Sequence, residues 1–269
     1  MIKGAGAIEL WFGLNARATR DIDLELPLSL DRLAAAFSTA LARGFGEFAF
    51  AVEDSAQPIR DQAVRVQVTM TYFGRGWATL DIDLAPLTER NQSTTLAIGS
   101  PEAGITSVTR ALKLEYIIAQ NIHAATTADR PDYQYDYARH VVDVLFLIRG
   151  VDLTNVRAAC VAVFERRSSR DGRTWPPVFS LPDRWLGDYG EVLAEYRMTL
   201  SEQDVPIAFS QLLCSLVEVT LCPVLSTALS SSTTSHPATP QARLVRQLKR
   251  EPFSSTVYDS GSRWVASCK

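Results

Sequence analysis

The sequence predicts an α+β domain followed by a helical domain, and three observations support this. Four short runs in the first half of the chain are apolar or alternate apolar with polar residues, and they are rich in β-branched and aromatic side chains. One helical pattern lies between the first two runs. From about residue 107 onward, apolar residues recur at spacings of three and four, which is typical of helices. We therefore expect domains at 1–106 and 107–225 and a tail at 226–269.

The α+β domain is expected to contain strands at 21–27, 47–53, 64–73 and 77–84. The intervening helix presents one apolar face, made of Leu30, Leu33, Phe37 and Leu41. Ser29 is a candidate N-cap of this helix and Gly44 a candidate stop. The glycine-containing stretch YFGRGWATL predicts a hairpin over residues 64–84.

The second domain carries helical patterns at 110–124, 136–149, 153–166 and 184–198. The proline-rich stretch DGRTWPPVFSLPDRW predicts an extended loop. Residues 226–240 are rich in serine and threonine, so we expect disorder there. The basic run RLVRQLKR that follows could contact RNA phosphates or form a solvated helix face.

Bulk properties predict a soluble, cytoplasmic protein that does not contact a membrane. The net charge of −3 gives no overall attraction to nucleic acid or to acidic membranes. No apolar run reaches the length of about 20 residues that a membrane helix needs. The cysteines are widely spaced, which is typical of free thiols in a reducing compartment. They are Cys160, Cys214, Cys222 and Cys268.

Two aspartates, Asp21 and Asp23, fall one residue apart in the first expected strand. Side chains alternate along a strand, so both carboxylates project to the same face with their Cα atoms about 7 Å apart. Mg²⁺ prefers oxygen ligands and is commonly bound by one or two carboxylates together with substrate phosphates. The pair therefore indicates a metal site for a triphosphate, although a solvated strand edge would give the same pattern.

Two neighbouring segments could complete such a site. Lys3, Gly4 and Gly6 lie in a small-residue turn before a short helical stretch, AIELWFG, whose first amide groups could face a phosphate. A plain turn would also explain these glycines. Downstream, Asp81 and Asp83 share one face of another expected strand. One of them could supply a third carboxylate that deprotonates an attacking hydroxyl, or both could belong to an exposed sheet face.

The run IKGAGAIELWFGLNARATRDIDLEL resembles the opening motif of the AbiEii/AbiGii-type nucleotidyltransferase toxins, in which Lys-Gly-Gly-Thr-Ala-Leu precedes Arg-x-Thr-x-Asp-x-Asp. Arg17, Thr19, Asp21 and Asp23 match the second part position by position. The similarity continues through GWATLDIDL, LEYIIAQNIHAAT, DYARHVVDVLFL and WPPVFSLPDRW. It covers roughly residues 1–225.

This resemblance implies a polymerase-β-like nucleotidyltransferase domain with a mixed sheet, followed by a helical region. It also implies Mg²⁺, an NTP substrate, an antitoxin partner, and an acceptor hydroxyl on tRNA or another RNA. The implied metal ligands are Asp21, Asp23 and Asp83. The implied substrate-binding residues are Lys3, Gly4, Gly6, Arg17, Thr19 and Arg139. The implied catalytic residues are Asp83, Asn121 and Asp143.

The chain departs from the family pattern in ways that concern catalysis. Gly4-Ala5-Gly6 replaces Gly-Gly-Thr, so a hydroxyl that could bind phosphate is missing. Asn121 stands where the family has a lysine, and an amide supplies no positive charge to a transition state. The family also has helices before the Lys-Gly motif, so we expect either an upstream start or a missing piece of the fold.

A further departure lies in the Arg-Asp-x-x-Asp motif, where His140 replaces the first aspartate between Arg139 and Asp143. Asp136, His140 and Asp143 share one helix face and could form either a polar cluster around the site or a partly buried structural network. His123 has no catalytic partner by spacing and is expected to be a packed structural residue.

The sequence therefore leaves two functions open. The first is an Mg²⁺-dependent toxin that transfers a nucleotide from an NTP to an acceptor hydroxyl. The second is a catalytically impaired homologue that binds a nucleotide or a partner protein. An unrelated hydrolase or kinase finds no support, because the sequence contains none of the motifs GxxxxGK[ST], HExxH and GxSxG.

Overall fold

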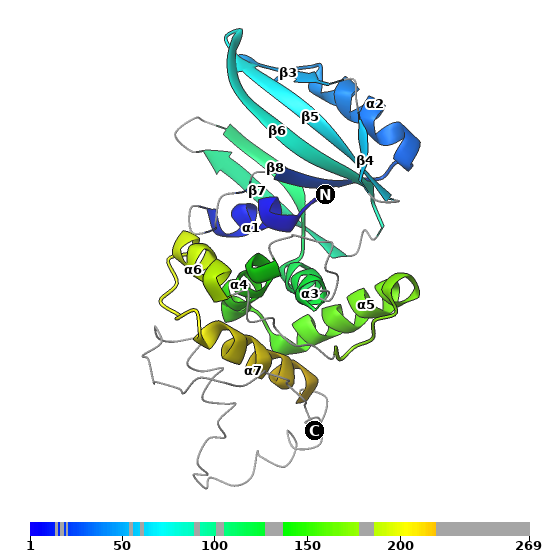
Figure 1. Cartoon of the computed structure of the whole chain (residues 1–269). Helices are drawn as coiled ribbons and strands as arrows, with labels where there is room; N and C mark the ends of the chain where they lie inside the picture. Colours follow the sequence, from blue (N-terminus) through cyan, green and yellow to red (C-terminus); the bar gives the residue numbers. More distant parts are fainter. Residues whose placement is uncertain are drawn as a thin grey trace, which may run out of the picture. The chain divides into compact units, whose positions relative to one another are not determined.

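The computed structural model divides the chain into two compact units, Met1–Lys113 and Leu114–Lys269 (Figure 1). The residues it describes are 1–13, 16, 19, 21–53, 56–59, 62–88, 92–100, 105–126, 137–177 and 186–218. The domain limits expected from the sequence, 1–106 and 107–225, stay predictions. The expected tail at 226–269 lies outside the described residues.

The first unit is built on a mixed sheet, which confirms the α+β fold class. Among the described residues its strands are β1 (Ile2–Lys3), β2 (Asp21–Leu26), β3 (Phe48–Val52), β4 (Gln57–Ile59), β5 (Ala63–Tyr72), β6 (Arg75–Pro86), β7 (Ser93–Ser100) and β8 (Ile105–Leu112). They lie in the order β3-β5-β6-β2-β1-β8-β7, with β4 beside β5. β2 is parallel to β6 and β1 to β8, and the remaining pairs are antiparallel.

The predicted hairpin is confirmed as β5 and β6, and it contains a β-bulge. Phe73 and Gly74 form its turn with positive φ angles of 47° and 71°, and Tyr72 pairs with Arg75. Met70 pairs with Ala78 but the next residue, Thr71, pairs with Gly76. Trp77 is therefore an extra residue on β6, and beyond it the register shifts by one.

Helix α2 (Leu30–Leu41) covers one face of the sheet, as the apolar pattern predicted. It contacts β3, β5 and β6 (Figure 1). The buried cluster between them consists of Leu33, Val66, Val68, Ile82 and Leu84. Ser29 occupies the N-cap position, but its side chain makes no capping hydrogen bond. Gly44 has a positive φ of 65° just beyond the helix, in agreement with its expected role as a stop.

The segment around residues 105–112 differs from expectation. We expected helical structure from about 107, with a helix over 110–124, whereas these residues form β8 and the helix begins only at Leu114. β8 pairs with β7 along its whole length, from Ser100 and Ile105 to Ser93 and Leu112. Because pairing with distant strands decides whether such a segment is extended, the local spacing of apolar residues was misleading.

The second unit is helical, as predicted. Its described helices are α3 (Leu114–Ala125), α4 (Tyr137–Leu147), α5 (Leu153–Asp171), α6 (Leu186–Glu195) and α7 (Asp204–Glu218), with a 3₁₀ turn η5 (Ile148–Gly150). α7 was not among the expected helices. Asp152 caps α5 by accepting a hydrogen bond from the Thr154 amide, and Gly172 ends it in the left-handed conformation. No helix of the described residues is long and apolar enough to cross a membrane.

The cysteines do not all behave as expected. Cys160 is a free thiol, and burial raises its pKa to about 12. Cys214, in contrast, is disulfide-bonded. The prediction of four free thiols was therefore wrong, because disulfide formation depends on distance in space and not on spacing in the sequence. Cysteine usage consequently gives no argument for a reducing compartment.

Candidate functional site

The parallel pairing of β2 with β6 places four aspartates in two cross-strand pairs. Asp21 lies opposite Asp81, and Asp23 lies opposite Asp83. The alternate residues of both strands, such as Ile82, pack toward α2. Since side chains alternate along a strand, the carboxylates project from the face opposite α2. Like charges directly opposite one another destabilise a sheet unless a cation neutralises them.

One of these pairs belongs to a row of four charged residues that crosses four strands. Arg65 on β5 pairs with Asp83, Asp83 with Asp23, and Asp23 with Lys3 on β1. We call Arg65, Asp83, Asp23 and Lys3 the charged row. Arg65 donates from Nε to Asp83 Oδ1 at 2.7 Å and from Nη2 to Asp83 Oδ2 at 2.9 Å. The row therefore has its two acids in the centre and a cation at each end.

The second aspartate pair is held by neutral groups. Gln67 on β5 pairs with Asp81, and its Nε2 donates to Asp81 Oδ1 at 3.2 Å. The Thr19 hydroxyl lies 2.7 Å from the Asp21 carbonyl oxygen and 3.2 Å from Asp21 Oδ1. The Thr19 amide donates to Glu9 Oε1 on α1 (Gly4–Phe12) at 2.9 Å. Thr19 thus connects the start of β2 to the first helix.

Asp23 is the most perturbed carboxyl group of the charged row. Burial raises its pKa to about 6, and the negative charges of Asp21 and Asp83 add to this rise. Lys3 and, more weakly, Arg65 oppose it. The ionised form of Asp23 is therefore costly here, and an additional cation beside it would stabilise that form.

The start of α1 lies against Asp23. Gly4 has a positive φ of 60°, and a Cβ atom added there would overlap Asp23 Oδ2. Glycine is thus required at this position both for its backbone conformation and for space. Gly6 has no such requirement, since its added Cβ would make only an ordinary contact of 3.5 Å with Ile2. Lys3 Nζ lies 3.3 Å from Glu25 Oε1, in addition to its place beside Asp23.

The acidic residues fit a hard divalent cation only in part. Carboxylate oxygens are the ligands that Mg²⁺ prefers, and Asp21 and Asp23 present them on one strand face. Both oxygens of Asp83, however, are already bonded to Arg65. Among the described residues, no three His, Cys, Asp or Glu side chains are arranged to hold a metal ion as they stand. The fork of Arg65 uses one lone pair of each Asp83 oxygen, so Asp83 is a weaker third ligand while that contact persists.

Asn121, which stands at the family's lysine position, is bonded to His140 in the second unit. Its Nδ2 donates to the Ile117 carbonyl oxygen at 3.1 Å. Its Oδ1 lies 2.7 Å from His140 Nδ1. An amide oxygen can only accept, so His140 carries a proton on Nδ1. Asn121 and His140, the two positions of the helical unit that depart from the family motifs, thus contact each other across α3 and α4.

The other motif residues of α4 contact different partners. Asp143 is 2% exposed and accepts a hydrogen bond of 2.7 Å from the Tyr196 hydroxyl. Arg139 Nη2 lies 3.5 Å from Glu195 Oε1. These contacts favour the partly buried structural network over a metal site on α4. Asp136, the third residue expected on this helix face, lies outside the described residues. The catalytic role of Asp143 and the substrate role of Arg139 stay predictions. Arg17 also lies outside the described residues.

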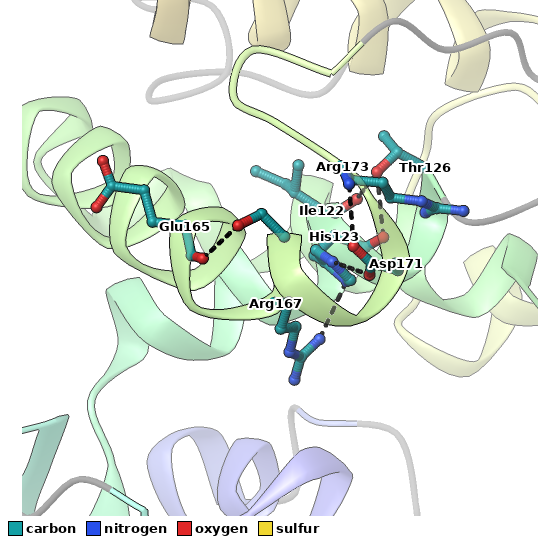
Figure 2. Close-up of polar contacts among 8 residues, drawn as sticks. Ile122, His123, Thr126, Glu165, Arg167, Asp171 and Arg173 are labelled. Atoms are coloured by element: carbon teal, nitrogen blue, oxygen red, sulfur yellow. Dashed lines mark hydrogen bonds and ion pairs between the residues drawn. The ribbon is translucent and has the colours of Figure 1, made fainter.

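His123 is a packed residue, as expected, and it belongs to a polar network that the sequence did not reveal (Figure 2). Its Nε2 lies 2.9 Å from Asp171 Oδ2, and Arg167 Nη1 lies 3.1 Å from its Nδ1. The Arg173 amide donates to Asp171 Oδ1 at 3.1 Å. Burial, assisted by Arg167, lowers the pKa of His123 to about 4, although Asp171 opposes this. The imidazole is therefore neutral at physiological pH and joins α3 to α5.

Arg65 and Gln67 are the site residues that sequence reasoning missed. Both alternate with buried valines in β5, so a polar strand face was recognisable. Their partners were not, because a regular hairpin would pair Arg65 with Ile82. Only the bulge at Trp77 brings Arg65 opposite Asp83.

A mixed sheet with paired carboxylates on neighbouring strands agrees with the nucleotidyltransferase fold expected from the sequence. The chain belongs to the AbiEii family: the sequence model described as "Nucleotidyl transferase AbiEii toxin, Type IV TA system" matches residues 1–213. It is thus a nucleotidyltransferase, the toxin component of a toxin–antitoxin system. No curated protein matches the sequence.

Ten solved chains resemble this one, and they include the following two proteins. JHP933 from Helicobacter pylori has 15% sequence identity and a TM-score of 0.49, and the likeness covers 86% of this chain and 89% of that one. The nucleotidyltransferase toxin MenT4 from Mycobacterium tuberculosis H37Rv has 16% identity and a TM-score of 0.49, with 80% and 84% covered. Because both TM-scores lie below 0.5, neither likeness bears on ligands or chemistry.

Proposed function

We propose that this toxin uses Mg²⁺ and transfers a nucleoside monophosphate from an NTP to a hydroxyl group of RNA, with tRNA as the acceptor. The observation that carries this proposal is the cross-strand pair of Asp23 and Asp83, flanked by Lys3 and Arg65 in the charged row. Two half-buried acids that face each other on neighbouring strands destabilise the sheet unless they bind a cation. That cost is acceptable in a site that binds metal and triphosphate together.

The proposed roles follow from the places of the side chains. Asp21, Asp23 and Asp83 would hold the metal, which when bound would neutralise charge on the triphosphate. Thr19 orients Asp21 through its hydroxyl. Lys3 and Arg17 neutralise phosphate charge, and Gly4 and Gly6 let the triphosphate approach the start of α1. Asn121 and Arg139 are proposed to bind substrate, as the resemblance to the family motifs implies.

In the reaction, Asp83 accepts the proton of the acceptor hydroxyl. The hydroxyl oxygen forms a bond to the α-phosphorus, and the bond from that phosphorus to the bridging oxygen breaks, so that pyrophosphate leaves. The contact with Arg65 uses one lone pair of each Asp83 oxygen. Loosening this contact would make the carboxylate more accessible to the acceptor hydroxyl.

The test is Mg²⁺-dependent labelling of RNA by an α-³²P-labelled NTP. Asp21→Asn and Asp23→Asn remove one charge each with little change of shape, and we expect a loss of at least about 100-fold in rate. Glu53→Gln is the matched control, because Glu53 is an exposed acid at the end of β3. Labelling that persists at the wild-type rate in both aspartate variants would refute the proposal.

The acceptor is tested with two forms of the same tRNA. Periodate oxidation destroys the vicinal diol at the 3′ end and leaves the remaining hydroxyls intact. We expect intact tRNA to be labelled and oxidised tRNA to remain unlabelled. Equal labelling of both forms would place the acceptor elsewhere on the RNA, and labelling of neither, with labelled protein instead, would exclude RNA as the acceptor.

A further inference from the structure

The contact between Arg65 and Asp83 suggests a control element inside the site. The guanidinium binds both oxygens of Asp83, at 2.7 and 2.9 Å. We propose that Arg65 and a divalent cation compete for Asp83, so that Arg65 holds this carboxylate when no metal is bound and releases it when the metal enters. This inference rests on the proposed metal site of Asp21, Asp23 and Asp83.

The geometry of the contact supports competition. An arginine bound in this forked manner engages both carboxylate oxygens with charge-assisted hydrogen bonds, which are about twice as strong as neutral ones. A metal ligand needs at least one of the same oxygens directed at the ion. Each oxygen keeps a second lone pair, but the fork holds the carboxylate and offsets its charge, so Asp83 is a weaker metal ligand while Arg65 is bound and a weaker partner of Arg65 while the metal is bound.

The surroundings allow the exchange to take place. The side chains of Arg65 and Asp83 are 32% and 20% exposed, respectively. Separating a fully buried ion pair would leave two uncompensated charges inside the protein. In a half-buried pair, Arg65 can exchange its contact with Asp83 for water or for another anion. Arg65 stands on β5 at the edge of the acidic pairs, so it can withdraw without disturbing β2.

The charges of the row also favour the exchange of Arg65 for a metal ion as the partner of Asp83. Asp83 and Asp23 face each other directly, and only Lys3 and Arg65 flank them in the charged row. Without a metal, Arg65 stabilises Asp83 and thereby the strand register. When a cation of charge +2 binds the two acids, the guanidinium beside it becomes repulsive. Metal binding thus favours the released form of Arg65 for both steric and electrostatic reasons.

The test measures metal affinity directly, without turnover. Mn²⁺ binds to the oxygen ligands that suit Mg²⁺, and the free ion is quantified by electron paramagnetic resonance. We expect Arg65→Gln to bind Mn²⁺ about tenfold more tightly than the wild type. Arg65→Lys keeps the charge but cannot form the fork, so its affinity should fall between the two. Thr69→Val is the matched control on the same strand face, opposite Thr79 and away from the acids, with wild-type affinity expected. Circular dichroism verifies that each variant is folded.

The outcomes separate the two proposals. Affinity that is unchanged or weaker in Arg65→Gln, while Asp23→Asn abolishes binding, would overturn the competition but leave the metal site intact. Wild-type affinity in Arg65→Lys together with tight binding in Arg65→Gln would show an effect of charge alone and would also overturn it. If Asp23→Asn has no effect on Mn²⁺ binding in any background, the metal site fails and the competition fails with it.

Discussion

Asp23 on β2 and Asp83 on β6 lie directly opposite each other on two parallel strands, at a position where Asp23 is half-buried. The pKa of Asp23 is raised from 3.8 to about 6. A raised acid pKa contributes stability that is present below pH 4 and lost as the pH rises through about 6.

We therefore expect Asp23→Asn to stabilise the metal-free protein at pH 7.5 by about 2 kcal/mol. The gain should disappear near pH 4, where Asp23 is protonated in the wild type. Urea unfolding in EDTA at the two pH values measures this. Glu53→Gln, which alters an exposed acid, should leave the free energy of unfolding unchanged at both pH values. A destabilised Asp23→Asn protein at pH 7.5 would contradict the expectation.

Gly4→Ala tests the close approach of α1 to Asp23. The new Cβ would overlap Asp23 Oδ2, and the positive φ of 60° adds strain. Gly172→Ala is a matched control, since Gly172 has a left-handed conformation with φ 70° but no atom within 4 Å of its added Cβ. Both variants should lose about 1 kcal/mol of unfolding free energy from backbone strain. Gly4→Ala should lose more unfolding free energy than the control and should also lose nucleotidyl transfer activity. Equal effects at the two positions would contradict the overlap.

Deleting Trp77 tests whether this residue is the extra one in the hairpin. Without it, Met70 still pairs with Ala78 and Arg65 with Asp83, so the hairpin becomes regular and the charged row keeps its register. The deletion should therefore change the free energy of unfolding by less than about 1 kcal/mol, because no polar side chain turns toward the core. Trp77→Ala keeps the bulge and removes a ring that is 64% exposed, so its cost should also stay below about 1 kcal/mol. Thermal unfolding compares the two variants, and a loss above about 3 kcal/mol in the deletion alone would contradict this pairing.

The His123 network predicts a pH dependence of the opposite sign to that of Asp23. The pKa of His123 is lowered from 6.5 to about 4, so its contribution to stability is present above pH 6.5 and is lost as the pH falls through about 4. NMR titration resolves its imidazole readily, since the chain has three histidines. Arg167→Met should raise this pKa and Asp171→Asn should lower it. A wild-type value near 6.5 would contradict the burial of this group.

Because Asn121 contacts His140, substitutions at these two positions should have coupled effects on the free energy of unfolding. Asn121→Lys and His140→Asp should each cost about 1 kcal/mol, because each breaks the hydrogen bond of 2.7 Å. The double variant should recover stability, since it places a lysine opposite an aspartate at the same positions. A double-mutant cycle by urea unfolding measures the coupling. RNA labelling by the same proteins shows whether the restored lysine raises the rate, and additive stability losses would argue against direct contact.

Local patterns predicted the elements whose apolar residues meet a nearby partner. The strand at Asp21 and Asp23, the helix at Leu30–Leu41 and the hairpin at 64–84 all follow from alternation, helical spacing and turn residues. β7 and β8 were missed, because Ser93–Ser100 carries small and polar residues and becomes a strand only by pairing with β8. The disulfide at Cys214 escaped prediction for the same reason, since contacts between distant residues leave no local signal.

The sequence by itself determined the family, the α+β class and the common face of Asp21 and Asp23, because these depend on motif identity and on the alternation of side chains along one strand. Only the tertiary structure decided which charges meet. The parallel pairing of β2 with β6 places Asp23 opposite Asp83, and the bulge at Trp77 places Arg65 opposite Asp83. Register arises from the packing of whole strands against α2, so whether Trp77 is left out of the pairing decides whether Arg65 faces Asp83 or Ile82.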